Sequence, residues 1–288
     1  MISHVVVTPF RNEGQFLPEL IETMTSQTII PSEWILVDDH SSDGSIQLIE
    51  DAIIEHDWIR LVRGTEPGPR RRGGKVARLV NLGLNSTNLE WSFLSKIDAD
   101  ISLTLDYFER ILEKFEDEKL GIASGNCFLV KAGRKKIEKV EFDHTRGALK
   151  TYRRRCFEDI GGILEIDGWD GLDNLTARYK GWKTKNFPDI VVEHRRATGS
   201  LESSISDHIN TGRKSHIMSY SWPYLLAKSL ISMLKRPYLV GGLCIILGFV
   251  KSKIEGVETI SDKEMRLFVR REQKRKLVNR IWSGRILN

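Results

Sequence analysis

Two carboxylates, Asp98 and Asp100, stand on either side of Ala99 directly after an apolar run at 91–97. The run has the length and composition of a buried strand. Carboxylates at positions i and i+2 just beyond a strand end can share a divalent cation, and hard oxygen ligands of this kind suit Mg²⁺ or Mn²⁺. Because the same triplet also serves as turn chemistry in ordinary loops, its meaning depends on what the rest of the chain places beside it.

Strand-like and helix-like segments alternate through the first part of the chain. Apolar β-rich runs predict strands at 4–9, 34–37, 59–63 and 91–97, and helical stripes predict helices at 15–25, 45–55 and 75–84. This alternation is typical of a parallel sheet with helices packed against it. Ligands of such sheets bind beyond the carboxyl ends of the strands. Polar clusters at 11–13, 38–39 and 98–100 follow three of those ends, so we predict that they form a single site.

The pattern is less regular after the acidic triplet. Further helices are predicted at 105–114, 152–160 and 170–180, strands at 121–130 and 190–192, and a basic loop at 131–139. From about residue 203 the chain has the pattern of a helical tail. We therefore predict a sheet-containing domain at 1–202 and a helical region at 203–288.

Composition limits the classes of protein that this chain can be. It has 288 residues, a formal net charge of +5 and three cysteines that lie far apart. These cysteines provide neither a disulfide framework nor a metal motif, which favours a reducing cytoplasm, and the chain enters its first strand without a signal-peptide pattern. The modest positive charge suits anionic substrates or an anionic membrane surface, and it is too small to indicate nucleic acid. We expect a cytoplasmic protein, with peripheral attachment to the inner face of the membrane as a further expectation.

The tail has two features that bear on that attachment. Residues 238–250 carry no charge, but thirteen residues are fewer than the roughly 20 that a helix needs to span a bilayer. Residues 261–285 are dense in arginine and lysine, with an apolar stripe of Leu277, Val278, Ile281 and Trp282. Two interpretations stay open: a helical subdomain packed on the core, or an interfacial anchor for an anionic membrane.

Four motifs in a fixed order resemble those of glycosyltransferase family 2, whose fold is called GT-A. They are TPFRNE at 8–13, VDDHSSD at 37–43, DAD at 98–100, and two glycines at 161–162 followed by GWD at 168–170. The resemblance covers roughly residues 4–200. It implies an α/β, Rossmann-like and mostly parallel sheet flanked by helices, with a helical extension at the C-terminal end.

The resemblance also implies how a nucleoside-diphosphate sugar is bound. Pro9, Arg11 and Glu13 would line the pocket for the base and ribose, with Glu13 accepting a ribose hydroxyl. One carboxylate of the pair at 38–39 would accept a hydrogen bond from the base, and the family match favours Asp39. The other carboxylate of the pair is free to cap the amides of Ser41 and Ser42.

The donor's diphosphate and a metal ion would lie next to these residues. By resemblance Asp98 meets the donor ribose, Asp100 contacts Mg²⁺ or Mn²⁺, and His194 is a further metal ligand. A histidine at a polar strand end can equally be bonded to the backbone. Lys75 is our candidate for closing over the diphosphate, at the end of the basic stretch 70–75. The adjacent cations at 195–196 can hold phosphate, although one of them is expected to be solvated.

Asp170 is the predicted catalytic base. Family members commonly place an acidic pair here, and this chain has Trp169-Asp170 instead. The departure leaves room for Asp173, which shares a helical face with Asp170 at i and i+3. Asp170 can also be a helix N-cap, and Trp169 can either stack on an acceptor sugar or pack in the core.

The family resemblance implies an inverting, metal-dependent transfer of a sugar to a hydroxyl of a glycan or lipid-linked acceptor. A Gln-x-x-Arg-Trp motif is absent from the sequence, which favours single additions over a processive synthase. Two alternatives stay open. A nucleotidyltransferase that makes sugar nucleotides would use a similar domain, but the segment 8–15 is not the glycine-rich phosphate loop expected after its first strand. A protein that keeps the fold and binds nucleotide sugars without catalysis is the other.

Overall fold

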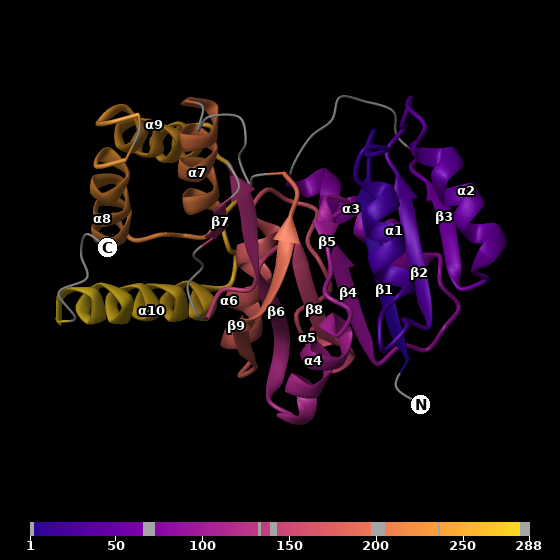
Figure 1. Ribbon diagram of the computed structural model, residues 1–288. Coiled ribbons are helices and arrows are strands. Elements are labelled where there is room, and N and C mark those ends of the chain that lie inside the picture. Colours follow the sequence, from indigo (N-terminus) through magenta and orange to yellow (C-terminus); the bar gives the residue numbers. More distant parts are fainter. Residues whose placement is uncertain are drawn as a thin grey trace. The chain divides into compact units, whose positions relative to one another are not determined.

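The computed structural model describes residues 3–65, 73–131, 134–138, 143–196, 205–235 and 237–282 (Figure 1). The chain divides into two compact units, Met1–Ala197 and Thr198–Asn288. The boundary predicted at 202–203 falls among residues 197–204, which lie outside the described residues, so it stays a prediction. The arginines at 70–72 also lie outside them.

The first unit is built on a nine-stranded sheet in the order β3-β2-β1-β4-β8-β6-β9-β5, with β7 paired to β6. The strands are β1 (His4–Phe10), β2 (Glu33–Asp38), β3 (Ile59–Arg63), β4 (Phe93–Ile97), β5 (Ile101–Ser102), β6 (Leu120–Lys131), β7 (Arg134–Ile137), β8 (Leu149–Arg153) and β9 (Lys183–His194). The pairings of β1 with β2 and β4, of β2 with β3 and of β6 with β9 are parallel. Strand β8 is antiparallel to both β4 and β6, so β6 and β9 run in the same direction as β1 to β4.

Helices cover both faces of this sheet. Those of the first unit are α1 (Leu17–Thr25), α2 (Ser45–Glu55), α3 (Gly74–Asn85), α4 (Tyr107–Glu113), the short 3₁₀ turn η1 (Lys114–Glu116), α5 (Arg154–Asp159) and α6 (Trp169–Tyr179). Alternate residues of β1 and β2 enter two cores: Val6 and Leu36 pack with α1, α2 and α4, whereas Val7 and Ile35 pack with α3, α5 and α6. Because both faces are buried, the central strands are continuous apolar runs, which is the pattern that revealed them in the sequence.

Strands β5, β7 and β8 escaped the sequence analysis, and β9 was predicted only in part. The prediction of a helix at 152–160 is wrong at its start, because Tyr152 lies in β8 and the helix begins at Arg154. Part of the predicted basic loop is β7, and β9 begins seven residues before the predicted strand at 190–192. These strands lack a clear apolar pattern; β8 even buries Lys150 completely, so period-two hydrophobicity could not identify it.

The second unit is helical, as predicted. It contains α7 (Ile205–Ile217), α8 (Trp222–Met233), α9 (Val240–Ile254) and α10 (Lys263–Trp282). Helices α7 and α9 approach closely at Gly212 and Gly248, where an added Cβ would lie 2.1 Å from the carbonyl oxygens of Ile245 and Ile209 respectively. Within the described ranges, every helix is too short or too polar to cross a bilayer.

Candidate functional site

The predicted site residues follow the carboxyl ends of strands that run in the same direction. Glu13 follows β1, Asp39 follows β2, Asp98 and Asp100 follow β4, and His194 is the last residue of β9. The end of β9 is tied to the acidic triplet, because Ile101 pairs with His194 and the Arg195 amide donates to the Asp100 carbonyl at 2.8 Å. The polar clusters are therefore gathered at one edge of the sheet, which the arrowheads of β1, β2 and β9 mark in Figure 1.

Arg196 bridges two carboxylates from different strand ends. Its NH2 group lies 2.6 Å from Glu13 Oε1, and its Nε lies 2.9 Å from Asp100 Oδ2. The ring of Phe16 supports the guanidinium from one side, with 5.2 Å between the cation and the ring centroid. Arg195, in contrast, pairs with Glu19 and Glu193 and is more exposed. Of the two adjacent arginines, Arg196 is thus the one that lies among the predicted site residues.

Asp100 and His194 lie together and affect each other's protonation. His194 Nε2 is 3.5 Å from Asp100 Oδ1, and His194 Nδ1 is 3.4 Å from Glu138 Oε2. Burial raises the pKa of Asp100, but His194 and Arg196 outweigh burial and hold that pKa below its ordinary value. Burial lowers the pKa of His194, while hydrogen bonds and charges of Asp100 and Glu138 outweigh it and raise the pKa to about 9.

The two carboxylates after β2 have different surroundings. Asp38 Oδ1 accepts a hydrogen bond from the Ser41 amide at 2.9 Å, which is the turn-capping arrangement. Asp39 Oδ1 lies 2.6 Å from Lys75 Nζ at the start of α3, and Asp39 Oδ2 lies 3.6 Å from Arg11. Asp39 is therefore the carboxylate of this pair that contacts other predicted site residues, Lys75 and Arg11. Pro9 is the penultimate residue of β1 and pairs with Val37 in register.

Asp98 and Asp170 both contact the two-residue segment Gly147–Ala148. The Asp98 amide donates to the Ala148 carbonyl at 3.1 Å, just before β8. A Cβ added to Gly147 would lie 3.4 Å from Asp170 Oδ2, so that carboxylate lies against Gly147. The Asp98 carboxylate is half-exposed and is paired with the buried Lys96.

Asp170 and Asp173 differ in the access of their carboxylates. Asp170 is half-buried in the first turn of α6, whose N-cap is Gly168 in the left-handed conformation, so Asp170 is not the cap. Asp173 is only 6% exposed, and its carboxylate accepts hydrogen bonds from Lys150 and the Tyr152 hydroxyl. Burial raises the pKa of Asp173. That shift would suit a base, yet both oxygens are taken up inside the core, so the geometry favours Asp170 over Asp173.

Trp169 packs in the core. It is 5% exposed, and the ammonium groups of Lys96 and Lys150 lie 5.8 Å and 5.3 Å from its ring centroid. The two lysines that neutralise Asp98 and Asp173 therefore also hold Trp169, and with it the start of α6.

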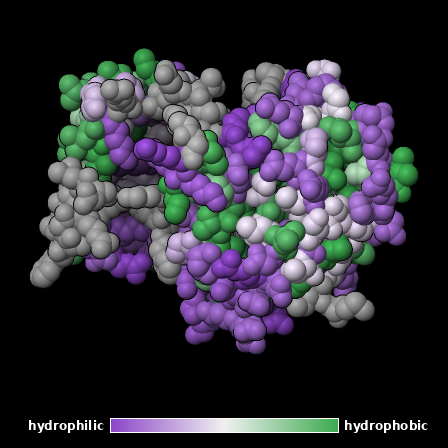
Figure 2. All heavy atoms as spheres, viewed as in Figure 1, coloured by the Kyte–Doolittle hydropathy of each residue, from purple (hydrophilic) through white to green (hydrophobic). Residues whose placement is uncertain are grey.

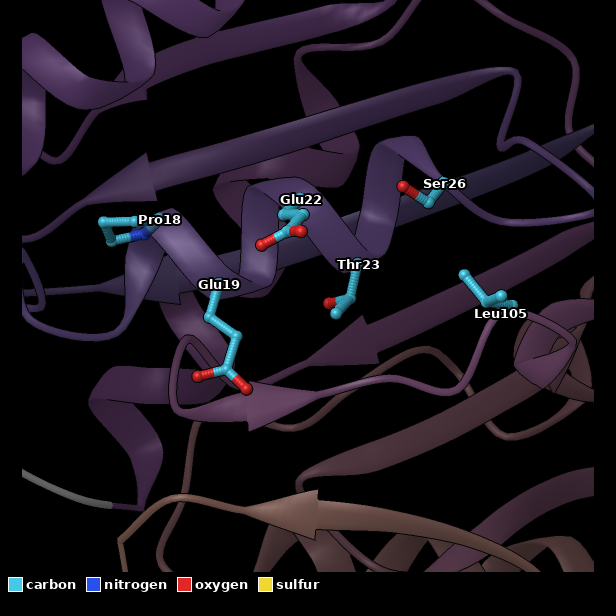
Figure 3. A pocket seen from close by; sticks show the side chains of 6 residues that line it. All are labelled: Pro18, Glu19, Glu22, Thr23, Ser26 and Leu105. Atoms are coloured by element: carbon cyan, nitrogen blue, oxygen red, sulfur yellow. The ribbon is translucent and has the colours of Figure 1, made fainter.

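A surface pocket of about 540 Å³ lies elsewhere, along α1 (Figure 3). Its lining residues come from α1, the residue after it and the loop before α4: Pro18, Glu19, Glu22, Thr23, Ser26 and Leu105. None of the predicted site residues lines it, and it is lined by two glutamates without a lysine or arginine. Its chemistry does not suit a diphosphate, so we place the candidate site at the sheet edge.

A family model described as Glycosyl transferase family 2 matches residues 5–168, more than half of the chain. The chain belongs to glycosyltransferase family 2. The family predicted from the four motifs is thereby confirmed. A solved mannosyltransferase of Pyrobaculum calidifontis, PcManGT, matches with a TM-score of 0.59 and 17% identity over 88% of each chain. This likeness confirms the GT-A fold.

Two curated relatives of the family-2 chain are named as glycosyltransferases. It is 24% identical over 123 residues to glycosyltransferase GlyG of Streptococcus pneumoniae, an alignment that covers 43% of this chain and 38% of the relative. It is 21% identical over 249 residues to the uncharacterized glycosyltransferase EpsJ of Bacillus subtilis, covering 75% and 69%. The chain therefore spans well under half the length of the first of these relatives.

Several charged residues of this family-2 site were not identified from the sequence. Lys96 and Lys150 lie within strands, where a buried ammonium needs a partner, and that need was a usable signal. Glu138 is a single acid within a run of lysines and arginines. Its carboxylate accepts hydrogen bonds from Arg146, eight residues away, and from His194, 56 residues away, and the contact with His194 could not be read from a local pattern.

The Lys150–Asp173 pair generates a prediction about stability. Asp173→Asn should lower the free energy of unfolding by about 3–5 kcal/mol, because it leaves the fully buried Lys150 ammonium without its countercharge. Asp170→Asn, at a half-buried position three residues away, should change it by less than about 1 kcal/mol. Urea denaturation followed by circular dichroism measures both.

Replacing both partners is the control for that interpretation. The double variant Lys150→Met with Asp173→Leu removes the two charges together and should recover most of the loss. If Asp173→Asn is as stable as Asp170→Asn, the pair does not anchor α6.

Proposed function

We propose that this protein transfers a sugar from a nucleoside-diphosphate donor to a hydroxyl of a glycan or lipid-linked acceptor, with inversion at the anomeric carbon. The observation that carries the proposal is the gathering of Glu13, Asp39, Asp98 and Asp100 at one sheet edge, with Asp170 against the segment that holds Asp98. Membership of family 2 supports it. PcManGT, which shares the fold, was solved with GDP-Man and Mn²⁺.

Nucleoside binding is assigned to the β1–β2 side of the edge. Glu13 is assigned to accept a hydrogen bond from a ribose hydroxyl, and Asp39 to accept one from the base. Pro9 and Arg11 line the same side. Lys75, which now pairs with Asp39, carries a charge on a flexible stem and is assigned to the diphosphate.

The donor set at the other side fits Mg²⁺ or Mn²⁺. Asp100 offers a carboxylate oxygen, and His194 offers Nε2, 3.5 Å from Asp100 Oδ1. Asp98, half-exposed and two residues from Asp100, is assigned to the donor ribose. The carboxylate oxygen suits Mg²⁺ and Mn²⁺ alike, and the imidazole nitrogen, a softer ligand, favours Mn²⁺ of the two. When bound, the ion supplies positive charge to the leaving diphosphate. Arg196 holds the carboxylates of Glu13 and Asp100 in place beside it.

Asp170 is assigned as the general base. A carboxylate in this position would remove the proton of the acceptor hydroxyl as its oxygen attacks the anomeric carbon, and the bond to the diphosphate breaks in the same step. Asp170 lies in the first turn of α6. Contacts of the Trp169 ring with Lys96 and Lys150 hold this turn in place.

A panel of sugar nucleotides tests the reaction class. With Mn²⁺ and no acceptor, at least one sugar nucleotide should be hydrolysed slowly to free sugar and nucleoside diphosphate, measured by chromatography. Formation of inorganic diphosphate from a sugar phosphate and a nucleoside triphosphate would instead identify a nucleotidyltransferase. Binding of sugar nucleotides without any turnover would identify a protein that retained only the binding step.

Two carboxylate variants separate donor binding from catalysis. Asp100→Asn should abolish the Mn²⁺-dependent part of donor binding, measured by calorimetry. Asp170→Asn should leave donor affinity unchanged and lower turnover by roughly 10²- to 10⁴-fold, the usual contribution of a general base.

The matched control is Asp117→Asn, an exposed carboxylate before β6 at the opposite edge of the sheet. It should behave like the original protein in both assays. Near-normal transfer by Asp170→Asn would show that the base lies elsewhere.

A further inference from the structure

Among its described residues, the second unit has an apolar face of exposed side chains. Exposed apolar side chains recur every four residues along α8 and just beyond it, at Trp222, Leu226, Leu230 and Leu234. The same spacing recurs along α9, from the residue before it, at Leu239, Leu243 and Leu247. Other residues of these helices are buried, namely Leu225 on α8 and Ile245 and Phe249 on α9, and the half-exposed Trp222 ring packs edge-on against Phe249, with 5.2 Å between the ring centroids. Figure 2 shows apolar surface, in green, over these two helices.

The unit that carries this face is strongly basic. Residues 198–288 contain 16 lysines and arginines against 7 acidic residues, a net charge of +9, whereas residues 1–197 contain 28 against 32, a net charge of −4. Exposed lysines stand at the ends of the apolar face: Lys235 after α8, and Lys251 and Lys253 in the last turn of α9. The positive charge of the whole chain therefore comes from this unit.

We propose that α8 and α9 dock this apolar face onto an anionic lipid bilayer. Leucines at helical spacing with an aromatic residue at one end suit insertion to the depth of the headgroups, and the surrounding lysines suit anionic lipid. A helix of 15 residues is about 22 Å long, shorter than the roughly 30 Å hydrocarbon core, so α9 lies in the interface. A second copy of the same face is disfavoured because two units of charge +9 would repel each other.

Co-sedimentation of the full chain with vesicles tests the docking face. The protein should sediment with vesicles of phosphatidylcholine mixed with phosphatidylglycerol, and added salt should weaken this binding. The double variant Leu230→Ser with Leu247→Ser should lower the partition coefficient by about tenfold or more, because two exposed leucines no longer enter the bilayer.

The control changes two exposed apolar residues of the first unit, Ile54→Ser with Leu105→Ser. These should leave the partition coefficient unchanged. Equal binding of the Leu230/Leu247 variant and the original protein to anionic vesicles would overturn the proposal. So would equal binding of the protein to pure phosphatidylcholine, or a dimer in light scattering that the Leu230/Leu247 variant dissociates.

A separate observation concerns Glu138, which lies behind His194 as seen from Asp100. Glu138 Oε2 is 3.4 Å from His194 Nδ1 and 2.8 Å from Arg146 NH1, and Arg146 Nε donates to Asn126 at 2.9 Å. Ligand atoms of Cys127, Glu138 and His194 lie within 4.8 Å of one another. A cation between them is disfavoured, because the Arg146 guanidinium already neutralises Glu138 and burial raises the pKa of the Cys127 thiol to about 12.

We infer that Glu138 is a positioning residue for His194. Glu138 accepts a hydrogen bond from Nδ1 and so keeps Nε2 directed at Asp100. An outer carboxylate commonly orients metal-ligating histidines in this way. Arg146 and Asn126 in turn fix the Glu138 carboxylate. This inference rests on the proposed metal role of Asp100 and His194.

The Mn²⁺ affinity of the protein without donor, measured by electron paramagnetic resonance, tests this role. Glu138→Ala should weaken Mn²⁺ binding by about 10- to 100-fold, and Glu138→Gln, which can still accept the Nδ1 proton, should recover most of it. Glu193→Ala removes the neighbouring carboxylate that pairs with Arg195 and should have no effect.

The two failures are distinguishable. If the original protein does not bind Mn²⁺ at all, the proposed metal site is wrong. If it binds Mn²⁺ and Glu138→Ala binds equally well, the metal site stands and the positioning role of Glu138 is wrong.

Discussion

The structure of the site depends on neutralising carboxylates that the sheet brings together. Strands that run in the same direction end at one edge, and this chain places acidic residues after three of those ends. Glu13 and Asp100 are both buried, and a buried carboxylate is tolerated only when it is paired. Arg196, which follows the last strand of the unit, supplies the shared cation. The site therefore forms only when the chain has completed the sheet.

The same constraint explains the other pairs around the edge. Lys75 faces Asp39, Lys96 faces Asp98, and Lys150 faces Asp173. Each of the first two pairs has one partly exposed partner, Lys75 and Asp98 respectively, whereas the Lys150–Asp173 pair is sealed in the core. This difference in exposure separates residues that can meet a donor from those that only support the scaffold. It also explains why two aspartates on one face of α6 have such different surroundings.

The sequence predicted the parts of the fold that have strong local patterns. Both faces of the central strands are covered, so β1, β2 and β4 are uninterrupted apolar runs, and the acidic clusters after them were visible at once. The motifs then indicated the family. Strand β8 was missed because its buried Lys150 and Thr151 look like surface residues until their partners are known. His194 meets the Glu138–Arg146 pair from a distant part of the chain, and such a contact has no signature in any short window. The roles of the individual site residues stay predictions.

The two residues before β8 have a mechanical consequence. Ala148 holds the main chain of Asp98, and Gly147 lies under the carboxylate of Asp170. The distance between the Asp98 main chain and the Asp170 carboxylate therefore depends on one short piece of backbone. Loops around these residues can diverge and admit new sugars or new acceptors without changing that distance.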